Sequence, residues 1–102
     1  MSNIRVSVSD NGREVSIAVV GRFDFSVHKE FRDTYTNCNS AGLSFVLDLS
    51  QTEYMDSSAL GMLLLLKEHA DKCKGKVVLS RPAPGVRKIL DIANFGKQFT
   101  IA

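Results

Sequence analysis

One segment of the sequence constrains the fold more than any other, because it has the pattern of a strand, a helix and a second strand. The short apolar run Leu43–Leu49 precedes a helical pattern that extends over about 57–73. Lys74-Gly75 is a common kind of helix stop, and the run Lys76–Leu79 that follows is again short and apolar. Such a unit predicts two parallel strands joined by a right-handed helical crossover.

The residues before this unit predict a hairpin and one further helix. Apolar residues alternate with polar ones over 4–8 and again over 15–19, and the two runs flank an Asn11-Gly12 turn. This is the pattern of two antiparallel strands. Apolar residues then recur every three or four positions from Val27 to Cys38, which predicts an amphipathic helix capped by Ser26.

The residues after the unit predict a third helix and a closing strand. Two prolines form a rigid connection, and the apolar residues of 86–93 are spaced as the core face of a helix, before a last short strand over 98–101. The sequence therefore predicts a single domain over residues 1–102, with an α/β fold. We expect a mixed sheet of about five strands, an N-terminal hairpin followed by parallel units, with three helices packed on it.

Composition and motif spacing exclude several classes of function. A net charge of +2 with scattered basic residues is unlike a nucleic-acid-binding protein. The longest apolar stretch, Ala59–Leu66, is far shorter than the ~20 residues that span a bilayer, and no secretory signal is present. Cys38 and Cys73 stand alone, so we expect buried free thiols in the cytoplasm and no metal site.

Two predicted loops hold the residues with the most informative chemistry. One is Gly21–Asp24, between the second strand and the first helix, and the other is Met55–Ser58, before the long helix. In α/β units the loops that follow parallel strands lie on one rim, where the helix N-termini also point. Neighbouring strands are about 5 Å apart, so the two loops are expected to form one composite surface.

Ser57 stands where a phosphate is compatible with a folded helix. A residue in the first turn faces unpaired N–H groups and the positive end of the helix dipole, which favour an added phosphate. The simpler interpretation is that Asp56, Ser57 and Ser58 only cap the helix. Two features argue for more. Three capping residues stand where one suffices, and Gly61 costs the helix about 1 kcal/mol, which indicates that another element or a partner approaches it closely.

The hexamer at 56–61, Asp-Ser-Ser-Ala-Leu-Gly, together with the strand at 45–50 before it, resembles the signature of the STAS domain family, the anti-sigma factor antagonists. The segment Gly21-Arg22-Phe23-Asp24 resembles the Gly-Glu-Leu-Asp segment of that family, and residues 84–95 resemble its last helix. The resemblance covers nearly the whole chain in order and spacing. Ala59 stands where the family more often has glycine, and Arg22 where it has an acidic residue.

The resemblance implies a switching cycle. Such proteins bind an anti-sigma factor, often a serine kinase with a histidine-kinase-like ATPase fold, and so release a sigma factor. Phosphorylation of the serine after the aspartate, here Ser57, breaks the complex, and a PP2C-type phosphatase restores it. ATP belongs to the kinase, so this chain is expected to need no cofactor. The partner-binding residues implied by the resemblance and the rim are Arg22, Phe23, Asp24, Asp56, Ser58, Ala59 and Gly61.

Alternatives stay open on the sequence alone. Residue types do not decide between Ser57 and Ser58 as the phosphorylated residue; only the family position favours Ser57. A STAS module that binds a small ligand or lipid, or that scaffolds a signalling complex, is the alternative function, and an apolar pocket would favour it. One or two of the four leucines of 63–66 are candidates for exposed partner contacts. Catalysis is not expected, because no nucleophile elbow or oxyanion device is present.

Overall fold

A five-stranded mixed sheet forms the centre of the computed structural model, which describes residues 3–38 and 41–102. Its strand order is β1-β2-β4-β6-β7. The strands are β1 (Ile4–Val8), β2 (Glu14–Val19), β4 (Ser44–Asp48), β6 (Lys76–Ser80) and β7 (Thr100–Ile101). Strand β1 runs antiparallel to β2, and the other pairs are parallel. The predicted hairpin, the parallel units and the α/β fold class are confirmed.

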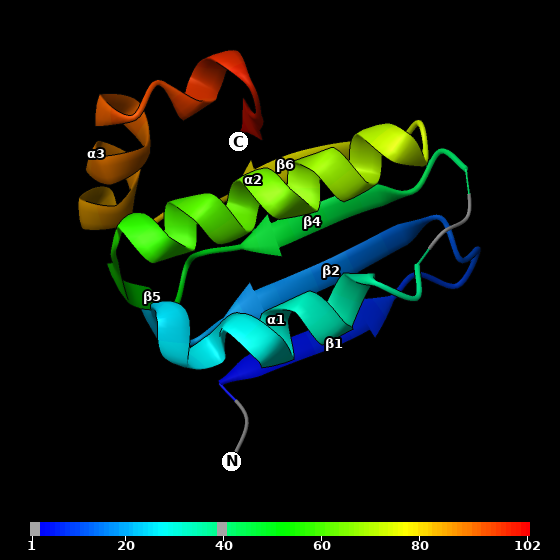
Figure 1. Ribbon diagram of the computed structural model, residues 1–102, viewed down its shortest axis with the longest axis horizontal. Helices are drawn as coiled ribbons and strands as arrows, with labels where there is room; N and C mark the ends of the chain where they lie inside the picture. The colour runs from blue at the N-terminus through cyan, green and yellow to red at the C-terminus, as the bar shows by residue number, and fades with distance from the viewer. Residues whose placement is uncertain (1–2, 39–40) are drawn as a thin grey trace.

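Two short strands lie outside the main sheet and were not predicted. Strand β3 (Gly21–Phe23) pairs in parallel with β5 (Thr52–Met55) in a separate two-stranded sheet. Neither segment is predicted as a strand, because runs of three and four residues are too short to show the alternation that marks a strand. Figure 1 shows β5 at the end of the main sheet toward which β2 and β4 point.

The helices divide between one face of the main sheet and its end. Helices α1 (His28–Tyr35) and α2 (Ser57–Lys72) lie side by side across one face, whereas α3 (Pro84–Ile92) lies at the sheet end against β5 (Figure 1). Short 3₁₀ turns, η1 (Phe25–Val27) and η2 (Phe95–Lys97), precede α1 and follow α3. Within residues 3–38 and 41–102, no helix combines the length and apolar character needed to cross a bilayer.

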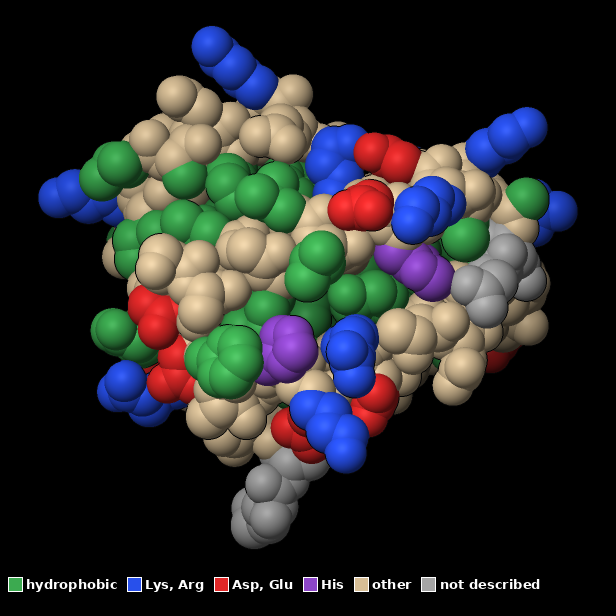
Figure 2. Space-filling view, viewed as in Figure 1, with side chains coloured by type: hydrophobic (Ala, Val, Ile, Leu, Met, Phe, Trp, Pro, Cys, Tyr) green, Lys and Arg blue, Asp and Glu red, His purple; other side chains and the backbone are tan. Residues whose placement is uncertain are grey.

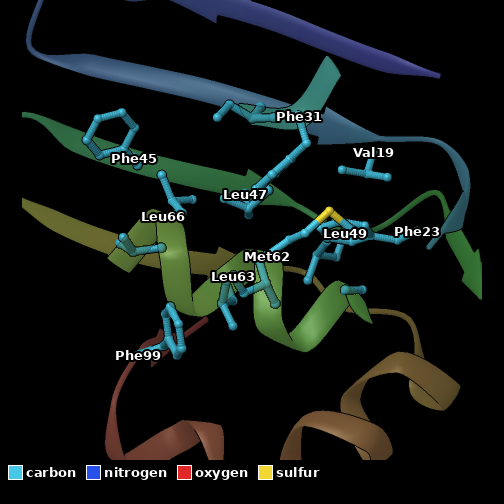
Figure 3. Close-up of a cluster of buried hydrophobic side chains, with 14 of the residues drawn as sticks. Val19, Phe23, Phe31, Phe45, Leu47, Leu49, Met62, Leu63, Leu66 and Phe99 are labelled. Atoms are coloured by element: carbon cyan, nitrogen blue, oxygen red, sulfur yellow. The ribbon is translucent and has the colours of Figure 1, made fainter. Parts of the chain in front are cut away.

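The hydrophobic core lies between the main sheet and the two helices on its face. Alternate residues of the central strands point into this layer and meet the apolar sides of α1 and α2 (Figure 3). The side chains of this layer include Val19, Phe31, Phe45, Leu47, Leu49, Met62, Leu63 and Leu66. On the opposite face, Val46 and Val78 are only half-buried, so the central strands are less enclosed than their apolar runs suggested.

The two cysteines at the far ends of α1 and α2 differ from the prediction. Cys38 and Cys73 are free thiols, but both are half-buried rather than buried. His69 is half-buried as well, because its Nε2–H donates to the carbonyl oxygen of Cys38 at 2.9 Å and its ring packs beside Tyr35. The spacing of residues along one helix does not reveal such a contact between two helices.

The predicted stop after α2 is present, but its two residues have different roles. Lys74, not the glycine, takes the left-handed conformation, with φ of 56°. The N–H of Gly75 donates to the carbonyl of Ala70 at 2.8 Å and that of Lys74 to Asp71 at 3.1 Å, the bonds of a Schellman motif. A Cβ on Gly75 would overlap the carbonyl oxygen of Leu43. Glycine is therefore needed here for close backbone approach.

Candidate functional site

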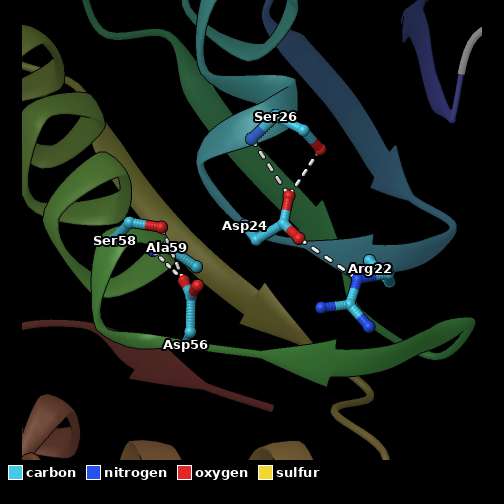
Figure 4. Close-up of polar contacts among 6 residues, drawn as sticks. All are labelled: Arg22, Asp24, Ser26, Asp56, Ser58 and Ala59. Atoms are coloured by element: carbon cyan, nitrogen blue, oxygen red, sulfur yellow. Dashed lines mark hydrogen bonds and ion pairs between the residues drawn. The ribbon is translucent and has the colours of Figure 1, made fainter.

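The pairing of β3 with β5 builds the site, because it brings the ends of two distant segments together. In their parallel register, Phe23 lies opposite Met55 as the last pair. The residues that follow, Asp24 and Asp56, therefore lie on neighbouring strand ends, as Figure 4 shows. The buried hydroxyl of Thr52 donates to the carbonyl of Val19 at 2.7 Å and fixes β5 to the end of β2. The two predicted loops thus do form one surface, which we call the rim (residues 21–26 and 54–61).

Asp56 caps α2. Its backbone is extended, and its Oδ1 accepts from the hydroxyl of Ser58 at 2.6 Å and from the N–H of Ala59 at 3.2 Å (Figure 4). The Ser58 hydroxyl first, and then the helix N–H groups, hold the pKa of Asp56 below its ordinary value, while burial and the negative charge of Asp24 act in the opposite direction. The capping interpretation is therefore correct for Asp56, and the Ser58 hydroxyl donates to the capping carboxylate.

The two serines of the hexamer differ in what their hydroxyls do. Ser58 is half-buried and its hydroxyl is held by Asp56. Ser57 is exposed in the first turn of α2, and its hydroxyl makes no hydrogen bond to any residue in the described ranges. A modifying enzyme can therefore reach the hydroxyl of Ser57 without breaking a hydrogen bond, whereas that of Ser58 is bonded to Asp56.

Asp24 organises the other half of the rim. Its Oδ1 accepts from the N–H of Ser26 at 3.0 Å and from the Ser26 hydroxyl, which caps η1 and replaces the predicted Ser26 cap of α1. Its Oδ2 accepts from Nε of Arg22 at 3.2 Å. The Ser26 hydroxyl and N–H, followed by the Arg22 guanidinium, hold the pKa of Asp24 below its ordinary value. The guanidinium of Arg22 lies 4.3 Å from the ring centroid of Tyr54, a contact that the sequence did not reveal.

Two residues predicted to bind a partner cannot do so with their side chains. Phe23 and Ala59 are 0% exposed, so their assignment to the partner surface is corrected. The ring of Phe23 packs on Phe31, 5.2 Å between centroids, and Ala59 faces the core from the first turn of α2. Both are part of the hydrophobic core on which the rim rests. The other predicted residues, Arg22, Asp24, Asp56, Ser58 and Gly61, reach the surface to different degrees.

Exposed apolar side chains lie on the rim and further along α2, and the sequence analysis predicted only some of them. Phe25 is 67% exposed, and its ring stacks on that of His28 with 4.9 Å between the ring centroids. Leu64 and Leu65 are exposed on α2, which confirms that part of the leucine run stays at the surface. Figure 2 shows hydrophobic side chains across the face that α1 and α2 form. Phe25 lies before the apolar periodicity of Val27 to Cys38, so no sequence signal marked it.

The Asp56 cap predicts a specific dependence of stability on pH. Because the folded pKa lies below the ordinary value of 3.8, the stabilisation is fully present above about pH 4 and is lost as pH falls through the lower folded pKa. Asn also caps helices but does not titrate in this range. Urea unfolding of wild type and Asp56→Asn should therefore show a stability difference that shrinks below about pH 4. A difference that stays constant down to about pH 2 would contradict this role of the carboxylate.

Comparison with known proteins places the chain in a family. The sequence profile described as "Mlab, STAS domain" matches residues 6–101. A STAS-domain containing protein of Pseudomonas aeruginosa is 46% identical over 94 residues, which are 92% of this chain and 93% of that protein.

Solved structures show the same architecture at low identity. The anti-sigma factor antagonist SpoIIAA in its unphosphorylated form has a TM-score of 0.80 and 19% identity, over 97% of this chain and 87% of that one. The phosphorylated form of the Bacillus cell fate determinant SpoIIAA has a TM-score of 0.73 and 18% identity, over 97% and 90% of the two chains. At such identities the likeness shows a shared fold. From the profile match and the Pseudomonas relative, this chain belongs to the STAS domain family.

Proposed function

We propose that this chain is an anti-sigma factor antagonist whose binding to its partner is switched by phosphorylation of Ser57. The observation that carries the proposal is the exposed, unengaged hydroxyl of Ser57 on a rim that also holds Asp24 and Asp56. Membership of the STAS family supports it, as does a fold similar to the antagonist SpoIIAA, a protein solved in both unphosphorylated and phosphorylated forms.

The switch acts on the surface and leaves the fold intact. In the unmodified state an anti-sigma factor that is also a serine kinase, with a histidine-kinase-like ATPase fold, docks over Ser57 and the exposed rim residues. A phosphate on Ser57 adds roughly two negative charges to a rim that already carries the carboxylates of Asp24 and Asp56. The N-terminus of α2 tolerates that charge, whereas a partner surface packed against Ser57 does not. A PP2C-type phosphatase removes the phosphate and restores binding.

In this proposal the chain itself carries no catalytic group and binds no nucleotide. The kinase supplies ATP, and Ser57 is the acceptor of its terminal phosphoryl group. A sigma factor and the ATP-dependent kinase that controls it act in the cytoplasm, which is where the proposal places this chain.

Peptide mass spectrometry on the protein from its native cells tests the modification directly. We expect a phosphate on Ser57 whose occupancy changes between growing and stressed cells, and none on Ser58, which serves as the internal comparison because its hydroxyl is held by Asp56. A Ser57 that is unmodified in every condition would contradict the proposal. Phosphate on Ser58 instead would contradict the choice of serine.

Gly61 gives a second test, which separates a partner contact from a structural need. Gly61 is exposed on α2, and a Cβ there would have no described atom within 4 Å. Nothing in the described fold therefore requires glycine. Gly61→Ala is expected to stabilise the protein by about 0.5–1 kcal/mol, the difference in helix propensity, and yet to weaken partner binding. Thermal unfolding and titration calorimetry measure the two effects; unchanged affinity would remove Gly61 from the interface.

The hollow between β5 and the start of α3 does not support the alternative of a lipid-binding module. A surface hollow of about 600 Å³ lies between β5 and the start of α3. It is open to solvent, and polar side chains, Ser50, Gln51 and Glu53, line part of it. A lipid tail needs an enclosed apolar lining instead.

A further inference from the structure

Arg22 is a cation held at the rim on the side of Asp24 away from Asp56 (Figure 4). Its side chain is 67% exposed, so burial does not hold it in place. Two contacts do: the ring of Tyr54, 4.3 Å from the guanidinium carbon, and Oδ2 of Asp24, 3.2 Å from Nε. The head group is thus held beside Asp24 and over the ring of Tyr54.

The register of these strands places Arg22 on the strand next to the one that leads into Ser57. Arg22 lies opposite Tyr54, and its side chain extends forward along the strand until Nε reaches Asp24, two residues further on. Asp24 lies at the end of β3 as Asp56 lies at the end of β5, and Ser57 is the residue after Asp56. Arg22 and Ser57 therefore belong to the same end of the β3–β5 pair, within about two residues of the last paired residues.

The donors of Arg22 are mostly unused. Only Nε makes a hydrogen bond to another described residue, and the four N–H donors on the terminal nitrogens have no hydrogen-bond partner in the described ranges. A guanidinium binds a phosphate through two such donors, and a dianionic phosphate attracts it more strongly than the single charge of a carboxylate. The negative charge of Asp24 acts to raise the pKa of Asp56, so the two carboxylates already repel each other. A phosphate on Ser57 adds to this repulsion.

We propose that Arg22 binds the phosphate of phosphorylated Ser57, giving up its contact with Asp24 to do so. This inference rests on the proposed function, because it needs Ser57 to be phosphorylated. The exchange pulls the phosphate across the gap from α2 toward β3 and frees the carboxylate of Asp24. The modified rim then differs from the unmodified one at two places, not only at Ser57. No covalent bond of the chain changes in this exchange.

Phosphorus NMR on the full chain tests this pairing without any partner protein. Phosphoserine is incorporated at position 57 during synthesis, and the second pKa of its phosphate is followed by pH titration in three proteins: otherwise wild type, Arg22→Ala and Arg13→Ala. Arg13 is the matched control, because it is exposed in the hairpin turn at the opposite end of β2 from the rim. Asp24, Asp56, Glu53 and His28, the other titratable groups near the rim, are the same in all three.

A nearby cation favours the dianion, so the phosphate pKa of the wild type should lie below that of Arg22→Ala by about 0.5 pH unit or more. Arg13→Ala should match the wild type. Equal pKa values in wild type and Arg22→Ala would overturn the pairing and leave the switch untouched. Because the phosphoserine is placed during synthesis, absence of phosphorylation in cells would overturn the proposed function alone. The two failures are therefore distinguishable.

Discussion

Gly75→Ala is expected to destabilise the fold by about 3 kcal/mol, at the upper end of the usual cost of overpacking. The new Cβ would overlap the carbonyl oxygen of Leu43, and neither is a flexible side-chain end that can move away. That carbonyl also accepts the N–H of Lys76 at 3.0 Å, and Gly42 donates to Cys73 at 2.8 Å beside it. A shift of either backbone would break the hydrogen bonds that connect α2 and β6 to β4.

Thermal unfolding measures this effect. For a domain of this size, a loss of that magnitude lowers Tm by on the order of 10–20 °C. Gly61→Ala is the matched control, since it makes the same chemical change on α2 at a position where a Cβ meets open space. The two alanine variants should shift Tm in opposite directions. A Gly75→Ala protein as stable as the wild type would show that the approach of Gly75 to Leu43 is not a constraint.

Ser57→Asp is expected to weaken binding to the anti-sigma partner by at least about tenfold, or ~1.4 kcal/mol. The added carboxylate lies in the first turn of α2, where the helix tolerates negative charge, but directly after Asp56 on the docking rim. Ser57→Ala removes only a hydroxyl that makes no hydrogen bond in the described ranges, so its affinity should stay close to that of the unmodified wild type. Both variants should fold normally.

Calorimetric titration against the purified partner, with circular dichroism to check the fold, measures both variants. Ser7→Asp controls for net charge, because Ser7 is exposed on the edge strand β1, away from the rim. It should bind like the wild type. Equal affinity of Ser57→Asp and Ser57→Ala would contradict the switch, and weakened binding by Ser7→Asp would mean that overall charge, and not the rim, controls affinity.

The sequence predicted those parts of the fold that are encoded by long local patterns. The alternation on either side of Asn11-Gly12 is sufficient for a hairpin, and the apolar periodicity of 57–73 for a long helix. The pairing of β3 with β5 is different in kind, because it joins segments about 30 residues apart and each is only three or four residues long. No local pattern indicates such a pairing, so neither strand could be predicted from the sequence.

For the site, too, the sequence predicted what depends on local residue order and missed what depends on strand register. Asp56 was recognised as a cap because its residue type and its position before a helix are sufficient. The contact of Arg22 with Tyr54 depends on the register of β3 against β5 and was therefore missed. Phe23 and Ala59 were placed on the partner surface because they lie within the motifs. Which of the motif residues face inward is decided by packing against α1 and the sheet.

The fold distinguishes Ser57 from Ser58, which the motif alone does not. Adjacent serines have the same chemistry in sequence, and only a resemblance favoured the first. In the fold, the hydroxyl of Ser58 donates to the capping carboxylate of Asp56 at 2.6 Å, and Ser57 is exposed to solvent. The geometry therefore supports, on independent grounds, the serine that the family position favours.

The most direct test of the central proposal compares one protein in two states. The dissociation constant for the anti-sigma partner is measured with unmodified protein, with protein carrying phosphoserine at position 57, and with the latter after treatment by a PP2C-type phosphatase. We predict that the phosphate weakens binding by about 100-fold or more and that its removal restores the original affinity. The same affinity in all three samples would contradict the account.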